Sequence, residues 1–167
     1  MSDVTPNDSS DPVPNEQAAK PKKPTTSQRK RARKLVLQAL YQWQISGSSI
    51  SQIEAEFRVD NDFDKVDVVY FRELFGQIPK EVTELDQHIS PFLDRPLEDV
   101  DNVELNLLRM GVYEFIHRID VPYRVVINEA VELAKQFGGT DGHKYINGIL
   151  DKLSLRLRAA ETRKRGA

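Results

Sequence analysis

The sequence predicts an all-α protein. Apolar residues recur at intervals of three and four along most of the chain, which is the spacing that gathers them on one face of a helix. Prolines and glycines interrupt this pattern at positions suited to helix ends. No segment of five or more residues alternates clearly between apolar and polar, so no strand is expected. We expect about six to seven helices, in one bundle or in two small packed subdomains.

The first predicted helix begins near Thr26 and Ser27, which are good N-cap residues, and ends at Gly47. Its apolar stripe consists of Ala32, Val36, Ala39, Leu40 and Trp43. Tyr41 falls on the opposite side, where we expect it to be exposed. A short second helix over about residues 50–58 and an acidic loop follow.

The longest apolar pattern keeps helical register from Phe71 to Ile89 and crosses Pro79. Proline inside a helix removes a backbone hydrogen bond and clashes with the preceding turn. The pattern therefore fits either one kinked helix or two stacked helices. Pro91 and Pro96 end the segment.

Residues suited to helix ends delimit the last three predicted helices. Their N-caps are expected at Asp101 or Asn102, at Asp120, and at Thr140 or Asp141. Pro122 suits the first turn of the second of these helices. Gly138 and Gly139 are expected to end it, because glycine adopts the left-handed C-cap conformation without strain.

Composition favours a cytoplasmic protein without a membrane anchor. No apolar stretch approaches the roughly 20 residues that a membrane helix needs. The absence of cysteine excludes disulfides, thiolate zinc sites and cysteine nucleophiles. Residues 1–27 contain five prolines and few aliphatic residues, which is typical of a disordered tail and unlike a secretory signal.

Charge is strongly segregated along the chain. Residues 29–34 carry +5 and residues 155–167 carry +4, whereas residues 1–28 carry −1. Because the whole chain carries −2, the remaining residues 35–154 carry −10. This division predicts polyanionic partners at the basic ends and a cationic partner on the acidic body.

The sequence contains no pattern typical of an enzyme. The three histidines, His88, His117 and His143, lie on different predicted elements without metal-ligand spacing. The glycine-rich residues 138–144 lack a preceding strand and the glycine spacing of a phosphate loop, so we interpret them as a junction between helices. We expect no catalytic site, cofactor or metal.

The strongest functional signal is the run Arg29-Lys30-Arg31-Ala32-Arg33-Lys34. Five cations at a helix start oppose the helix dipole and repel one another, which argues against a merely solvated surface. Cations neutralise phosphates and release counterions, and a nearby exposed aromatic ring such as Tyr41 can stack on an unpaired base. The run therefore favours nucleic-acid binding.

Several further blocks follow one another in a fixed order over about residues 28–153. They are Arg31-Ala32-Arg33, residues 38–44 (QALYQWQ), residues 67–72 (DVVYFR), residues 121–135 (VPYRVVINEAVELAK), Phe137-Gly138 and residues 143–152 (HKYINGILDK). With these blocks the chain resembles the NusB family of bacterial transcription antitermination factors. The resemblance implies two small helical subdomains and no catalytic activity.

The same resemblance implies partners. Proteins of this family bind the boxA sequence of nascent RNA together with NusE, a ribosomal small-subunit protein. With other Nus factors they help RNA polymerase pass terminators, notably in ribosomal RNA operons. The resemblance does not extend to residues 1–27, where the composition predicts a disordered tail. We expect a NusB-like RNA-binding domain over residues 28–158 and a basic C-terminal tail over residues 159–167.

Site residues carry over by position. The family's RNA-contacting helix start corresponds to Arg29, Lys30, Arg31 and Arg33. Lys30 departs from the arginine that is common there, which keeps the charge and loses bidentate phosphate recognition.

A second group falls later in the chain. Asp141 matches the acid that precedes the family's His-Lys pair at the RNA site, and Lys144 and Tyr145 are further candidates for base contacts. Gly142 departs from the more usual serine. Tyr41 and Glu104 match positions implicated in holding NusE.

Three alternatives remain. A DNA-binding helix-turn-helix around Gly138-Gly139 would begin its recognition helix at Asp141, which would meet phosphates unfavourably. NusB-like domains also precede some ribosomal RNA methyltransferases, but the sequence leaves no room for a cofactor-binding α/β domain. In a pure protein adaptor, the basic ends would serve only solubility.

Overall fold

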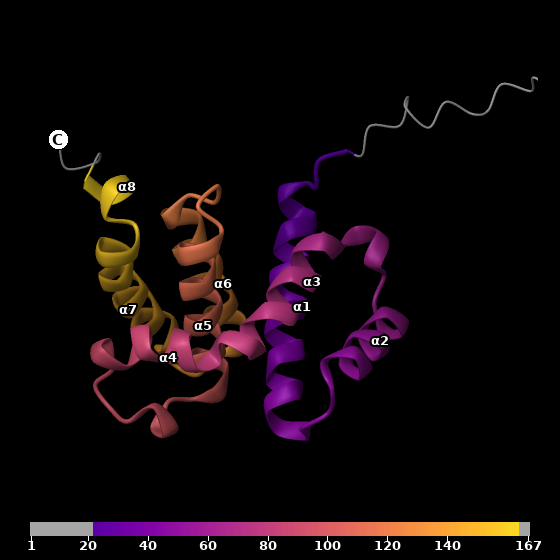
Figure 1. Ribbon diagram of the computed structural model, residues 1–167, viewed down its shortest axis with the longest axis horizontal. Coiled ribbons are helices and arrows are strands. Elements are labelled where there is room, and N and C mark those ends of the chain that lie inside the picture. Colours follow the sequence, from indigo (N-terminus) through magenta and orange to yellow (C-terminus); the bar gives the residue numbers. More distant parts are fainter. Residues whose placement is uncertain (1–21, 164–167) are drawn as a thin grey trace, which may run out of the picture.

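The computed structural model describes residues 22–163, so the predictions for residues 1–21 and 164–167 lie outside the described part. The described residues form eight α-helices: α1 (Thr26–Ser46), α2 (Ile50–Asp60), α3 (Val68–Gln77), α4 (Val82–Ile89), α5 (Asn102–His117), α6 (Tyr123–Phe137), α7 (Gly142–Leu157) and α8 (Ala159–Arg163). No strand occurs between residues 22 and 163, which confirms the all-α prediction (Figure 1). The short helix α8 forms within the residues expected to be a C-terminal tail.

The helices group into two packed units (Figure 1). In one unit α1 packs against α2 and α3, and in the other α5, α6 and α7 pack against one another with α4 beside α5. α1 also contacts α5 and α6 and so joins the units. This arrangement agrees with the predicted pair of small helical subdomains.

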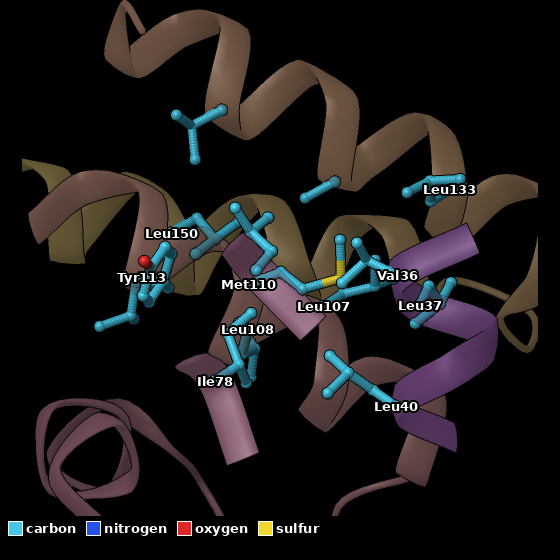
Figure 2. Packing of buried hydrophobic residues seen from close by; sticks show 14 of the residues in the cluster. Val36, Leu37, Leu40, Ile78, Leu107, Leu108, Met110, Tyr113, Leu133 and Leu150 are labelled. Carbon is cyan, nitrogen blue, oxygen red and sulfur yellow. The ribbon is translucent and has the colours of Figure 1, made fainter. Parts of the chain in front are cut away.

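One hydrophobic core runs through both units. Figure 2 shows Val36, Leu37 and Leu40 of α1 facing residues of α5, among them Leu107 and Met110. The predicted inward residues of α1 are buried, apart from Trp43, which is half-buried against the core. Because each fully buried aliphatic side chain contributes about 1.5–3 kcal/mol, burial of these residues stabilises the contact between α1 and α5.

The start of α1 is fixed one residue earlier than predicted. Thr25 is the N-cap: its hydroxyl accepts from the backbone N–H of Gln28 at 3.1 Å, and the Gln28 side chain accepts from the Thr25 N–H at 2.8 Å. This reciprocal pair satisfies two donors that a helix start otherwise leaves unpaired. At the other end Gly47 adopts φ 67° and closes the helix as predicted.

Pro79 separates two helices. α3 ends at Gln77, a 3₁₀ turn covers Ile78–Glu81, and α4 begins at Val82. Proline lies in the first turn of the 3₁₀ segment, where its missing N–H breaks no bond. Ile78 and Leu85 both stay buried, so the two short helices share the one apolar stripe seen in the sequence.

Two predicted helix ends are wrong in detail. Pro122, not Asp120, is the N-cap of α6, and the Asp120 carboxylate pairs instead with Arg118. Gly138 ends α6 in an extended conformation with φ −84°, not a left-handed one. Glycine is needed there because a Cβ would lie 2.6 Å from the Ala134 carbonyl oxygen. The left-handed residue of this junction is Asp141, with φ 63°.

Candidate nucleic-acid interface

The basic start of α1 is exposed along one side and anchored along the other. Lys30 and Arg31 face solvent, and the Lys30 side chain is 52% exposed. Arg29 is partly buried, because its Nε donates to Asp67 Oδ2 at 3.1 Å and its guanidinium lies 4.1 Å from the centre of the Tyr70 ring. The helix start therefore presents some cations to solvent and uses others to fix itself in place.

The segment before α3 holds this helix start. The backbone N–H of Asp67 donates to the Gln28 carbonyl at 3.1 Å, and Arg31 Nη1 donates to the Lys65 carbonyl at 3.3 Å. These contacts join segments more than thirty residues apart in sequence. A helix start positioned in advance loses less conformational entropy when a ligand binds.

A groove between α1 and α6 carries charges of both signs. It is lined by Lys30, Arg31, Lys34, Glu129, Glu132, Leu133, Lys135 and Gln136. Lys30 Nζ lies 3.0 Å from Glu129 Oε1, and Lys135 Nζ lies 3.5 Å from Glu132 Oε1. Four cations against two acids leave the groove positive, as binding of a polyanion requires.

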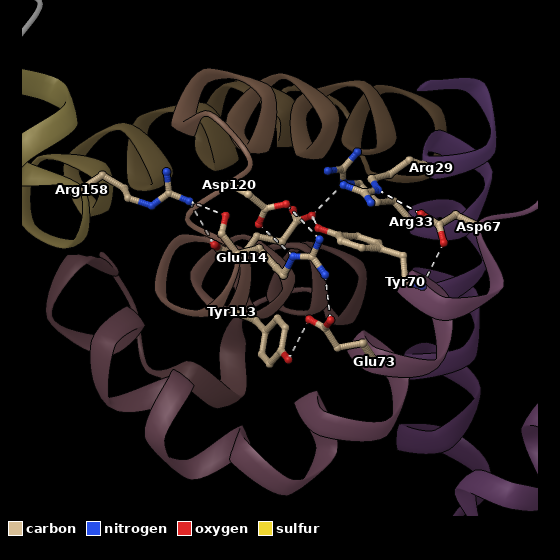
Figure 3. Close-up of polar contacts among 10 residues, drawn as sticks. Arg29, Arg33, Asp67, Tyr70, Glu73, Tyr113, Glu114, Asp120 and Arg158 are labelled. Atoms are coloured by element: carbon tan, nitrogen blue, oxygen red, sulfur yellow. Dashed lines mark hydrogen bonds and ion pairs between the residues drawn. The ribbon is translucent and has the colours of Figure 1, made fainter. Parts of the chain in front are cut away.

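Arg33 differs from its basic neighbours because it lies in the interior. Its side chain is 4% exposed, and its Nε donates to Glu114 Oε1 of α5 at 2.9 Å (Figure 3). The Tyr70 hydroxyl donates to the same carboxylate oxygen. In this structure the side chain predicted to contact RNA joins α1 to α5 beneath the surface.

The charge network around Tyr70 shifts the protonation of its members. Burial, and then the negative charge of Glu114, raise the pKa of the Tyr70 hydroxyl well above its ordinary value. Burial also raises the pKa of Glu114, against the opposing effects of Arg33 and Tyr70. Tyr70 therefore stays protonated and able to donate throughout the neutral range.

Asp141, Lys144 and Tyr145 lie together at the start of α7. Lys144 Nζ is 3.3 Å from Asp141 Oδ1, and both side chains are more than half exposed. The Tyr145 hydroxyl donates to Asp94 Oδ1 at 3.0 Å, and the Arg95 guanidinium lies 4.8 Å from the Tyr145 ring centre. Within residues 22–163 no hydrogen bond or ion pair links this group to the basic start of α1.

The two residues predicted to hold the protein partner lie on neighbouring helices. Tyr41 is 42% exposed and lines a shallow apolar pocket with Leu37, Gln38, Val103 and Phe137. Glu104 follows Val103 in the first turn of α5, and its carboxylate lies over Gly142 at the start of α7. The Lys34 ammonium lies 5.6 Å from the centre of the Phe137 ring, so the apolar pocket directly adjoins the basic groove.

Three features of this surface were not predicted. Arg33 lies three and four residues before the buried Val36 and Leu37, so the helical spacing itself contained the signal that it points inward. No spacing in the sequence indicated that Glu129 would lie in the basic groove or that Arg95 would lie over the Tyr145 ring. Their neighbours come from helices or loops distant in sequence, which periodicity cannot pair.

Other kinds of site are not found in the described part of the chain. Among residues 22–163 no three or more histidine and carboxylate side chains are arranged to hold a metal ion. None of the described helices has both the length and the apolar character needed to cross a membrane.

Fold and surface together define a small all-helical protein with one strongly basic helix start beside an apolar pocket. The NusB family model matches residues 30–155, and the chain belongs to the NusB family. It is 59% identical over 149 residues to the transcription antitermination protein NusB of Marinobacter nauticus, a match that covers 89% of this chain and 94% of that protein. It is 64% identical over 133 residues to the NusB of Hahella chejuensis, a match that covers 80% of this chain and 89% of that protein.

A solved structure is similar as well. The fold matches NusB of T. maritima with a TM-score of 0.66 at 30% sequence identity, covering 75% of this chain and 89% of that chain. The structural match and the sequence matches identify the same family.

Proposed function

We propose that this protein is a transcription antitermination factor that binds the boxA sequence of nascent RNA together with NusE. In this proposal it acts in the cytoplasm, without catalytic activity, as part of an RNA polymerase complex with other Nus factors. The observation that carries the proposal is the positive groove between α1 and α6, which is lined by Lys30, Arg31 and Lys34. Its neighbours in the family are named as transcription antitermination proteins.

The proposed RNA surface has two parts. Arg29, Lys30 and Arg31 at the start of α1 supply phosphate contacts, and affinity at this part depends on salt because counterions are released. Asp141, Lys144 and Tyr145 at the start of α7 supply the contacts that depend on base identity. Arg33 supports this surface from below through its ion pair with Glu114.

The proposed surface for NusE is the apolar pocket around Tyr41 with Glu104 beside it. An exposed aromatic ring next to a carboxylate suits a basic protein, because the ring packs against aliphatic stems while the acid pairs with a cation. The net charge of −10 on residues 35–154 would speed association with such a partner.

Binding of synthetic boxA RNA, measured by fluorescence anisotropy with and without NusE, tests the proposal. Arg31→Ala should weaken RNA binding and make the slope of log K against log salt shallower by about 0.7, the contribution of one single-strand phosphate contact. Arg72→Ala is the matched control, because Arg72 is exposed on α3 and pairs with Glu54 of α2.

RNA recognition, the role of the basic groove and the joint complex with NusE can each be contradicted by a separate binding result. Equal affinity for boxA RNA and for duplex DNA would contradict RNA recognition. Unchanged RNA affinity in Arg31→Ala and Lys34→Ala would point to a protein adaptor. No gain in RNA affinity on adding NusE would contradict the joint complex while leaving a lone RNA-binding protein.

A further inference from the structure

Glu129 is a carboxylate placed among the cations of the proposed RNA surface. It projects from α6 and its side chain is only 13% exposed. It lines the groove that contains Lys30, Arg31 and Lys34, and also a second pocket that contains Arg29 and Arg33. The cations on both sides of the α1 start therefore lie beside the same carboxylate.

The position of Glu129 has a direct effect on Lys30. The Lys30 ammonium lies 3.0 Å from Glu129 Oε1, so it is already paired with a carboxylate before any ligand binds. A phosphate that approaches Lys30 must displace this carboxylate or bind beside it and meet repulsion. For a ligand made only of phosphates, Glu129 is purely unfavourable.

RNA differs from such a ligand because it carries hydrogen-bond donors. An ionised carboxylate accepts hydrogen bonds and donates none, whereas phosphate oxygens are also acceptors. Ribose 2′-hydroxyls and the amino and imino groups of unpaired bases can donate to Glu129 and offset its repulsion. Phosphate chains without such donors cannot.

We propose that Glu129 is a specificity-determining residue, which accepts a hydrogen bond from a donor group of the RNA and disfavours polyanions that lack donors. This inference rests on the proposed function and assigns selectivity to a residue outside the predicted site. The cations of α1 attract any polyanion, and Glu129 favours those polyanions that can donate a hydrogen bond to it.

Competition between boxA RNA and inorganic polyphosphate, a polyanion without comparable donors, tests the proposal. In Glu129→Gln the side chain keeps its shape and loses its charge, which frees Lys30. Polyphosphate should then bind about threefold to fivefold more tightly, the upper range of effects measured for ion pairs near the surface. RNA should gain less, because the freed lysine is offset by a weaker hydrogen bond at position 129. The preference for RNA over polyphosphate should therefore fall.

Glu132→Gln is the matched control. Glu132 lies one turn along α6 in the same groove, pairs with Lys135 and is 63% exposed, so the same charge is removed from a solvated position. It should strengthen the binding of both ligands by the same small factor and leave their ratio unchanged. Thermal unfolding of both variants checks that the helices remain packed.

The RNA backbone can be varied to identify the donor. If the donor is a ribose hydroxyl, a 2′-O-methyl version of the RNA should lose more affinity for wild type than for Glu129→Gln, whose amide oxygen accepts only a weaker hydrogen bond. If a base supplies it, the methylated and unmethylated RNAs should behave alike while the loss of preference over polyphosphate persists.

An unchanged ratio of RNA to polyphosphate affinity in Glu129→Gln would overturn the proposal, whether both affinities rise or neither moves. Failure of the proposed function would look different. Wild-type protein would then bind boxA RNA no better than polyphosphate, before any substitution is made.

Discussion

The guanidinium of Arg33 and the carboxylate of Glu114 form an ion pair of 2.9 Å that connects α1 to α5, with both side chains almost fully buried. The pair lies directly beneath the basic helix start. Removing one partner from a buried ion pair leaves an uncompensated charge, whereas replacing both with apolar residues is much less harmful. The arrangement therefore ties the position of the proposed RNA surface to the core.

Arg33→Ala should lower the free energy of unfolding by about 3–5 kcal/mol, because Glu114 is left buried without its cation. Urea denaturation followed by circular dichroism measures this. Arg31→Ala, in the exposed neighbour, should change stability by no more than about 0.5 kcal/mol. The double variant Arg33→Met, Glu114→Leu should recover part of the loss, because the charge imbalance disappears while the buried Tyr70 hydroxyl loses its acceptor. Equal stability of the two single arginine variants would contradict the structural role of Arg33.

Arg158 should be a second arginine on which stability depends. It donates to the carbonyl oxygens of Phe115, Glu114 and Arg118 at 2.7, 3.1 and 2.8 Å, where α5 ends. Arg158→Ala would leave the Phe115 carbonyl without this donor and would remove the second hydrogen bond of the Glu114 and Arg118 carbonyls, which still accept from the backbone N–H groups of Arg118 and Val121. The expected loss in the free energy of unfolding is about 1–3 kcal/mol. The exposed Arg156 on α7 provides the control, and an effect of similar size there would refute the capping role.

The Asp120 carboxylate should add to the free energy of unfolding at neutral pH and lose this effect in strong acid. Hydrogen bonds from Arg118 lower the pKa of this carboxyl below its ordinary value of 3.8. A carboxyl with a lowered pKa in the folded state stabilises the protein above the unfolded value, and the contribution disappears as pH falls through the folded value. Because the side chain is 61% exposed, solvent screening limits the contribution at pH 7 to about 0.5–1 kcal/mol.

Asp120→Asn tests this directly. The wild type should be more stable than the variant at neutral pH, and the two unfolding free energies should converge by about pH 2. A difference that stays constant between these pH values would show that Asp120 acts through packing and not through its charge.

Gly142→Ser should change the environment of Glu104. A Cβ at position 142 would collide with the Glu104 carboxylate, which is the mobile end of a flexible side chain, so Glu104 can turn outward at little cost. Burial, followed by the nearby charge of Asp101, raises the pKa of Glu104. Serine should therefore lower that pKa toward its ordinary range, as measured by NMR titration of the Glu104 side chain. No change would mean that Glu104 does not move.

The helices could be predicted because their signals are local. Spacing of apolar residues, the Gly47 end and the Asp101 cap depend on residues within one or two turns, and all three agree with the structure. The chain's segregated charge was also readable from the sequence. The start of α6 was predicted wrongly because Asp120 pairs with its near neighbour Arg118, while the distant Glu161 carboxylate accepts from the N–H of Tyr123 in the first turn.

The sequence by itself determined the all-helical class, the family and the basic run at the start of α1. The helical spacing already places Arg33 on the inward side with Val36 and Leu37, and only the tertiary structure decided which partners the cations of this run meet. Arg33 points to Glu114, 81 residues away, and Lys30 meets Glu129 across the groove between α1 and α6. Helical periodicity sets the direction of a side chain relative to its own helix. The partner it meets depends on how helices distant in sequence pack together.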